Sequence, residues 1–596
     1  MTRITTLFLI LLNVVAAVLQ ADDVIPAGPR PYFDFDRHPE YQLRETVEVG
    51  EAGLVALWTK ALDKGGRELL CNVAESAALA YSMGHPHVND ELAHRLLASF
   101  KETDDRIARI SLAKTLVLMD FQAAEAAFAE AVTEQDYALC RIIEPALARW
   151  ANEAAIERNL KRIQTAGTLT PWRILAISAL GESGAQKARD ALLSMVQSNQ
   201  ERMDVRLESA RALSTIFRSG LESEARELLK RPSSEDRFAD LLAIEMVDKH
   251  NEADVIPVLE ASIESSSTSV QSLALAHLVR IDPERVAALV VNGTFSVAHS
   301  HPTLRASLIT ACHQTGGVEQ VRQLFAFLDD PHPGNRQLAA DAIFDLAQNS
   351  ELRAVAVDGV LTACSSNSWR VLEQACHLAA ALELKNTADR MLELVSFERP
   401  EVRPAAAFAI KEFQLPETLD RVVVLIKARS GGRYDLGDDD ARKNYAAECL
   451  AVRHLCELVG RMKHPAQAEL TPFVGKADED GLVLHSPPNR ATAIVVLGQL
   501  EATDAAPAIL ARLNDIGGMI PEYNIVREAS GYSLGYMKEP SALPDLQKYA
   551  SREGTVRDTG GACAWAIEQL GGEALQLPGP FEQWNTADWF LRPIEE

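Results

Sequence analysis

The sequence predicts an all-α protein, an α-solenoid in which helical hairpins repeat with a period of about 33 residues. Three observations support this prediction. A marker residue, usually arginine, recurs at nearly constant intervals between positions 106 and 403. Small and apolar residues follow it at helical spacing, and alanine is abundant while aromatic residues make up only 6% of the chain. A period this regular is the signature of a solenoid, whose hairpins bury their apolar sides on one another.

The unit is clearest in residues 391–413. They read as the end of one helix, a tight turn and a second helix that opens at residues 402–403. One apolar stripe at helical spacing lies along this second helix, formed by Val402, Ala406, Ala409, Ile410 and Phe413.

The marker arginine lies near the start of the second helix in most units. Its positions are Arg106, Arg141, Arg173, Arg206, Arg237, Arg305, Arg336, Arg370, Arg403, Arg490, Arg527 and Arg557, with weaker copies at Asn72, Gln271 and Asn444. The spacing becomes longer and uneven between Arg403 and Arg527, so the regular array is interrupted there.

This unit resembles the HEAT repeat in its short, PBS-lyase-like form. The best matches open with Val205-Arg206, Val402-Arg403 and Val526-Arg527, each followed by alanines and aliphatic residues. The resemblance covers roughly residues 50–570 and implies a right-handed α-solenoid of HEAT-like hairpins. It says little about activity, because one fold hosts many functions.

The repeated arginine needs compensation. A cation in the first turn of a helix opposes the helix dipole by roughly 0.3–1 kcal/mol when exposed. Acids stand just upstream in most units: Asp104, Asp105, Asp204, Asp236, Asp330, Glu401, Glu522 and Glu553. We therefore predict a ladder of Arg–carboxylate pairs between stacked turns, formed by Arg106, Arg173, Arg206, Arg305, Arg336, Arg403, Arg490, Arg527 and Arg557. The alternative is that these residues are solvated surface charges.

Residues 1–21 have the layout of a secretory signal peptide. Arg3 supplies the positive charge, residues 7–19 are almost entirely apolar, and Ala21 precedes the expected cut. The apolar run is short for a membrane span, although an uncleaved anchor is the alternative. We therefore expect a periplasmic or secreted protein whose mature chain does not span a membrane.

The two ends of the solenoid have segments suited to cover them. Residues 22–50 combine four prolines with aromatic residues, which predicts an extended arm laid on the first repeats, the alternative being a disordered linker. Residues 571–596 contain Trp584, Trp589 and Phe590 among prolines. They are expected to form a capping tail rather than an exposed tail that binds a partner.

Two polar insertions explain the broken period, at residues 430–440 and 471–489. Long loops often carry function, so these are the best candidate for a binding site if both lie on one face. Asp435, Asp438, Asp439 and Asp440 offer oxygen ligands of the kind that Ca²⁺ or Mg²⁺ prefers. Their spacing is not that of an EF-hand, and capping of the following helix is the favoured interpretation.

The remaining chemistry is sparse. The eight cysteines lie within apolar patterns, which favours buried thiols; Cys364 and Cys376 are the one pair that we would test for a disulfide between neighbouring helices. The histidines near residues 85–94 and 299–313 are not accompanied by a Cys or carboxylate pattern with the spacing of metal ligands, and we interpret them as polar turn residues. HEAT-type deoxyhypusine hydroxylases bind di-iron through His-Glu pairs, and this sequence contains no such dipeptide. Haem-attachment, zinc-protease and P-loop motifs are also missing.

A net charge of −25 argues against nucleic acid or an anionic membrane as a general partner. The sequence therefore favours an exported, non-catalytic scaffold that binds a protein or peptide on its concave face without a cofactor. The alternative is a metal-dependent enzyme or binder that uses the insertions between residues 430 and 490.

Overall fold

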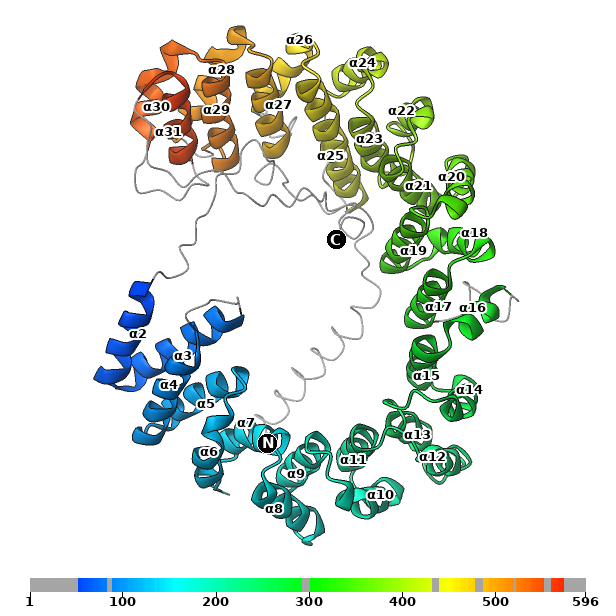
Figure 1. The fold of residues 1–596 in the computed structure, drawn as a ribbon. Coiled ribbons are helices and arrows are strands. Elements are labelled where there is room, and N and C mark those ends of the chain that lie inside the picture. The colour runs from blue at the N-terminus through cyan, green and yellow to red at the C-terminus, as the bar shows by residue number, and fades with distance from the viewer. Residues whose placement is uncertain are drawn as a thin grey trace, which may run out of the picture. The chain divides into compact units, whose positions relative to one another are not determined.

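The computed structural model describes residues 52–82, 88–133, 135–291, 301–430, 439–476, 486–517, 521–550 and 559–572. Every regular element within these ranges is an α-helix or a short 3-10 helix, as Figure 1 shows. The chain divides into two compact units, Val47–Val286 in one and Ala287–Glu596 with Met1–Thr46 in the other. The boundary falls inside α16 (Pro283–Val291), and each unit is described by itself.

In the unit of residues 47–286, helices alternate between the first and the second position of successive hairpins. The first helices are α2 (Ala52–Lys64), α4 (Asp90–Glu102), α6 (Glu125–Ala131), α8 (Glu153–Gln164), α10 (Arg189–Gln197), α12 (Glu222–Leu229) and α14 (Ile256–Ile263). The second helices are α3 (Arg67–Ser82), α5 (Arg106–Leu118), α7 (Tyr137–Arg149), α9 (Thr170–Glu182), α11 (Met203–Ile216), α13 (Ala239–Met246) and α15 (Thr268–Ile281). Short 3-10 helices lead into α6, α10 and α14, namely η2 (Gln122–Ala124), η3 (Gln186–Ala188) and η4 (Ala253–Val255). Each second helix packs on the next one along the unit.

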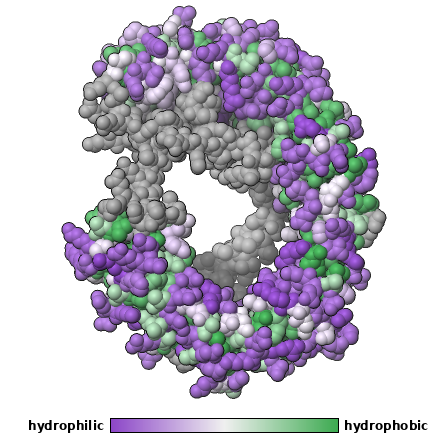
Figure 2. Space-filling model, in the orientation of Figure 1, coloured by the Kyte–Doolittle hydropathy of each residue, from purple (hydrophilic) through white to green (hydrophobic). Residues whose placement is uncertain are grey.

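The unit of residues 287–596 repeats this alternation. Its second helices are α17 (Pro302–Thr315), α19 (Pro333–Leu346), α21 (Trp369–Ala381), α23 (Val402–Phe413), α25 (Asp439–Arg461), α27 (Pro487–Gln499), α29 (Asn524–Tyr536) and α31 (Thr559–Gln569). Its first helices are α18 (Val318–Ala326), α20 (Ser350–Ala363), α22 (Ala388–Leu394), α24 (Leu419–Arg429), α26 (Gln467–Leu470), α28 (Ala506–Leu513) and α30 (Leu543–Tyr549). The 3-10 helices are η5 (Phe327–Asp329), η6 (Lys385–Thr387), η7 (Pro416–Thr418), η8 (Thr471–Val474), η9 (Thr503–Ala505) and η10 (Pro540–Ala542). Figure 1 shows the two sets as two layers, and Figure 2 shows mainly hydrophilic residues over the first helices.

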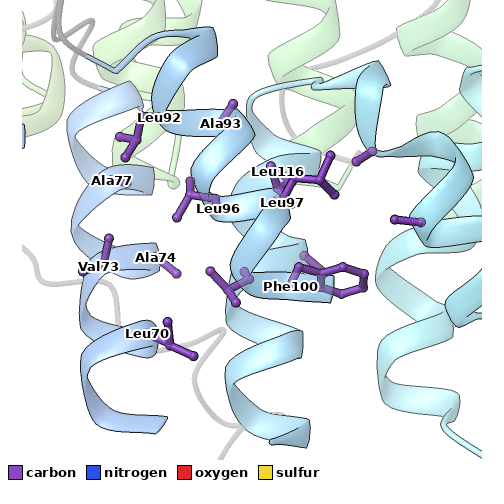
Figure 3. Close-up of a cluster of buried hydrophobic side chains, with 14 of the residues drawn as sticks. Leu70, Val73, Ala74, Ala77, Leu92, Ala93, Leu96, Leu97, Phe100 and Leu116 are labelled. Atoms are coloured by element: carbon purple, nitrogen blue, oxygen red, sulfur yellow. The ribbon is translucent and has the colours of Figure 1, made fainter. Parts of the chain in front are cut away.

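The core lies between the two layers of helices. In the first hairpins, Leu70 on α3, Leu96 and Phe100 on α4, and Leu116 on α5 meet in one buried cluster, shown in Figure 3. Phe100 also contacts Phe128 of the next hairpin edge to face, with ring centroids 5.2 Å apart. Full burial of one such side chain stabilises the fold by roughly 1.5–3 kcal/mol, so neighbouring hairpins hold one another in place.

Second helices end in a repeated turn. A residue in the left-handed region follows most of them, and these residues are Asp120, Ala151, Gly184, Glu383, Gln414, Lys463, Glu501 and Lys538. After α7, for example, the N–H of Asn152 donates to the carbonyl of Leu147 at 3.0 Å across Ala151. This is the bond of a Schellman motif, which satisfies a free helix carbonyl and turns the chain toward the next hairpin.

Glycine allows the last second helices to approach closely. A Cβ on Gly498 of α27 would lie 2.7 Å from Cα of Ser533 on α29, and one on Gly535 would lie 2.9 Å from Cα of Ala566 on α31. The hydroxyl of Ser533 uses this proximity to donate to the carbonyl of Ile494 at 2.7 Å. Backbone therefore packs directly on backbone in this part of the array.

The all-α solenoid prediction is confirmed, and α23 begins at Val402 as its apolar stripe indicated. The second insertion is less irregular than expected: residues 471–474 form η8, and residues 487–489 already belong to the first turn of α27. The predicted signal peptide at 1–21, the arm at 22–50 and all but the first two residues of the tail at 571–596 lie outside the described residues.

Candidate functional site between α25 and α27

The two insertions lead into neighbouring helices. The first precedes α25, which begins at Asp439, and the second runs into α27, which begins at Pro487. These second helices pack side by side. Between the N-terminal half of α25 and the start of α27 lies a pocket of about 210 Å³. Its lining is Tyr445, Ala446, Cys449, Leu450, Arg453, Ser486, Pro487 and Pro488.

Local sequence rules position this lining. Tyr445, Cys449 and Arg453 are spaced four residues apart on α25, so their side chains lie on one face of that helix. Ser486 is the N-cap of α27, where its side chain accepts a hydrogen bond from the backbone N–H of Asn489 at 3.3 Å. Prolines 487 and 488 follow, in a first turn where a missing N–H costs little.

The polar side chains of the pocket are a phenol, a thiol, a hydroxyl and the guanidinium of Arg453. Burial raises the pKa of the Cys449 thiol, although its hydrogen bonds with Ser486 and Tyr445 act in the opposite direction. Burial and the nearby Cys449 likewise raise the pKa of Tyr445. A thiol that stays protonated is a poor nucleophile. The pocket is therefore built to receive an apolar group beside a few hydrogen-bonding atoms, as ligand pockets commonly are.

The structure describes only two of the four aspartates that we considered as metal ligands. Asp435 and Asp438 lie outside the described residues, and Asp439 is the first residue of α25. The exposed carboxylate of Asp440 lies 3.6 Å from the ammonium group of Lys443, one turn along the helix. Within the described ranges, no cluster of three or more His, Cys, Asp or Glu side chains is arranged to hold a metal ion.

The structure places five of the ladder arginines beside a carboxylate that precedes the next second helix. The pairs are Arg106–Asp136 at 2.9 Å, Arg173–Glu201 at 2.8 Å, Arg206–Asp236, Arg305–Asp330 at 2.5 Å and Arg490–Glu522 at 2.5 Å. Their surroundings differ widely: the side chain of Arg106 is 61% exposed, whereas that of Asp330 is fully buried. The contribution of each pair to the stability of the fold therefore differs along the array.

The other ladder arginines have different partners. Arg336 and Arg403 pair with Glu373 at 3.3 Å and Glu448 at 2.7 Å, which lie inside the next second helix rather than before it. Arg527 lies over the ring of Tyr549, with 4.9 Å from Cζ to the ring centroid. Arg557 lies outside the described residues.

Some acids that we expected in the ladder have other roles. Asp204 and Glu401 pair within their own turns, with Arg202 at 2.8 Å and Arg399 at 3.0 Å. Spacing could not identify Glu373 or Glu448, because a carboxylate within a helix has the same pattern as an ordinary surface residue.

The side chain at the marker position also links the two helices of its own hairpin by a hydrogen bond. The Nε–H groups of Arg206, Arg403 and Arg527 donate to carbonyls near the end of the preceding first helix, at 3.0, 2.6 and 3.0 Å. Gln271 donates from Nε2 to the carbonyl of Ile263 at 3.1 Å in the same way. An amide can make this contact without a carboxylate partner, which accounts for the glutamine in this copy.

These features define a HEAT-like α-solenoid: helical hairpins stacked in sequence order, with a repeated residue at the turn that links each hairpin to the next. No protein-family model matches the chain, and no curated protein matches it. Among solved structures, yeast importin-beta (Kap95p) is 10% identical, over 88% of this chain and 73% of that one, with a TM-score of 0.44. Importin beta crystallised in a polyethylene glycol condition is also 10% identical, over 87% of this chain and 82% of that one, with a TM-score of 0.44. Human deoxyhypusine hydroxylase in complex with glycerol is 15% identical, over 50% of this chain and 99% of that one, with a TM-score of 0.19. Such low similarity carries no assignment of function.

Proposed function

We propose that this protein is a non-catalytic scaffold that binds a protein or peptide on the concave side of its second helices. The observation that carries the proposal is the apolar pocket between α25 and α27, the two second helices that follow the insertions in the sequence. Its volume of about 210 Å³ suits one apolar side chain rather than a whole small-molecule substrate. A buried anchor of this kind, in a long repeat surface, is a common basis of peptide recognition.

Export is part of the proposal, because it determines which partners the scaffold meets. The support is the signal-like pattern of residues 1–21 with the expected cut near Ala21. No helix of the described part has the length and apolar run needed to cross a bilayer. Mass spectrometry of the N-terminus of the protein, purified from its native cells, tests this: a mature chain that still contains the segment from Met1 to Ala21 would contradict cleavage.

The binding function is testable by selecting peptides from a displayed random library on the purified protein. Affinities of the selected peptides are then measured for the wild type and for Ala446→Leu, which fills the pocket from α25. We expect at least a tenfold loss of affinity. Val424→Leu is the matched control, because Val424 is 65% exposed on the first helix α24, away from the pocket lining.

Failure to select any peptide would contradict the scaffold function, and selected peptides that bind both variants equally would contradict the pocket as its anchor. Metal analysis of the same preparation tests the alternative. A stoichiometric ion that is lost in Asp438→Asn/Asp439→Asn would support metal-dependent function.

A further inference from the structure

The second helices α5 and α7 each present one stripe of exposed and half-buried residues at helical spacing. On α5 the stripe consists of Ile107, Ile110, Ser111, Lys114 and Leu118, and on α7 it consists of Ala138, Arg141, Ile142, Pro145 and Arg149. Both stripes follow the same offsets of three, four, seven and eleven residues, and α5 packs beside α7. The two stripes therefore form one continuous surface, here called the α5–α7 face.

Large apolar side chains are exposed on this surface. Ile107 is 50% exposed and Leu118 is 49% exposed, whereas the opposite side of α5 is fully buried. Leu79 on the adjacent α3 is 63% exposed. Figure 2 shows apolar patches over the segment labelled α2 to α5 in Figure 1. Single exposed apolar residues are common, but a cluster on neighbouring helices marks an interaction surface.

The charge of the α5–α7 face is opposite to that of the protein. Three cations lie on the two stripes and no carboxylate does, in a chain whose net charge is −25. Among the described residues, no carboxylate oxygen lies within 4.0 Å of Lys114 or Arg141, while Arg149 is 4.0 Å from Asp120. The α5–α7 face therefore favours a partner that brings negative charge together with apolar groups.

We propose that the α5–α7 face binds an acidic amphipathic helix, as one docking surface of the scaffold function proposed above. Ile107 and Leu118 are eleven residues apart on α5, which corresponds to roughly 16 Å along the helix axis. The partner that matches this face is a helix of three to four turns, with apolar residues spaced to contact Ile107 and Leu118 and with acidic residues beside them.

Neighbouring charges favour a narrow ligand over a broad anionic surface. Glu75 on α3 and Glu182 on α9 are exposed on the helices that flank the α5–α7 face. An anionic membrane or a nucleic acid duplex that covers the neighbouring helices as well would be repelled by these carboxylates, whereas a single helix can contact the α5–α7 face alone. The phosphate backbone of a nucleic acid would also leave Ile107 and Leu118 without apolar contacts.

The test uses two synthetic helical peptides of about five turns with identical leucine stripes, one with glutamate and one with lysine at the polar positions. Fluorescence anisotropy measures their binding to the full chain. We expect the acidic peptide to bind at least tenfold more tightly than the basic one, and more weakly as salt increases. In Lys114→Glu/Arg141→Glu this preference should reverse. Lys101→Glu/Lys161→Glu on the first helices α4 and α8 changes the net charge equally and should leave binding unchanged.

Several outcomes would overturn the inference. They are equal binding of the two peptides, loss of binding in the control double variant, and tighter binding of phosphatidylserine vesicles or duplex RNA than of the acidic peptide. Circular dichroism shows that each variant is folded. If peptides selected from the library bind while the acidic peptide does not, only this inference fails; if neither binds, the proposed function fails with it.

Discussion

Removal of Arg305 tests whether the buried pairs matter to stability. Its guanidinium makes two bonds to Asp330, of 2.5 and 2.8 Å, and the side chains are only 6% and 0% exposed. Arg305→Ala leaves a buried carboxylate without its cation, a change that typically costs about 3–5 kcal/mol. Asp330 keeps donors from the N–H of His332 at 2.7 Å and from Nδ2 of Asn335 at 3.2 Å. We therefore expect a loss near the lower end, about 3 kcal/mol.

The matched control is Arg106→Ala. Arg106 has the same place in its repeat and pairs with Asp136 at 2.9 Å, but its side chain is 61% exposed. An exposed pair is worth only about 0–1 kcal/mol, because water already solvates both charges. The two variants thus remove the same type of contact in two different solvent environments.

The assay must resolve local stability, because a long repeat array need not unfold in one step. Native-state hydrogen exchange of amides in α17 and α19 measures the effect of Arg305→Ala, and amides in α5 and α7 measure that of Arg106→Ala. Equal losses in the two variants would refute the reasoning. Arg305→Met/Asp330→Asn, which removes both charges, should recover much of the stability; no recovery would mean that lost packing, not an unpaired charge, is the cause.

Three further predictions concern the fold. Gly498→Ala should destabilise by about 2 kcal/mol or more, measured by hydrogen exchange of amides in α27 and α29, because its Cβ would meet Cα of Ser533 at 2.7 Å. Gly517→Ala, with nothing within 4 Å of the new Cβ, should have little effect. Glu501→Gly should stabilise by about 0.5–1 kcal/mol, since Glu501 has a φ of 52° after α27; a loss of stability would show that its side chain matters more than its backbone. Burial raises the pKa of Asp341 to about 6, so its ionisation destabilises the fold as pH rises from about 4 to above 6. Asp341→Asn should therefore stabilise by about 1 kcal/mol at pH 7 and far less at pH 4, and an equal gain at both pH values would refute this.

The sequence was informative where the fold depends on one repeated local pattern. The stripe from Val402 to Phe413 located α23 because apolar spacing and burial have the same period. The charge partners were harder to predict, since a carboxylate before a helix and one inside it differ only in three-dimensional position; Glu448 is such a case. The pocket between α25 and α27 was out of reach, because it depends on how Tyr445 and Ser486, which are distant in sequence, meet across two helices.

The exposed stripes of α5 and α7 explain why sequence reasoning pointed to the insertions and not to this surface. Net charge is a sum over the whole chain, and a value of −25 conceals three cations that only the fold gathers on one face. Lys114 and Arg141 lie on different helices with a whole first helix between them, so neither forms a basic run with the other. In a solenoid, two residues that are about one repeat length apart in the sequence lie on neighbouring hairpins and are close in space. Charges that recur at this spacing therefore predict a binding surface better than runs of charge along the chain.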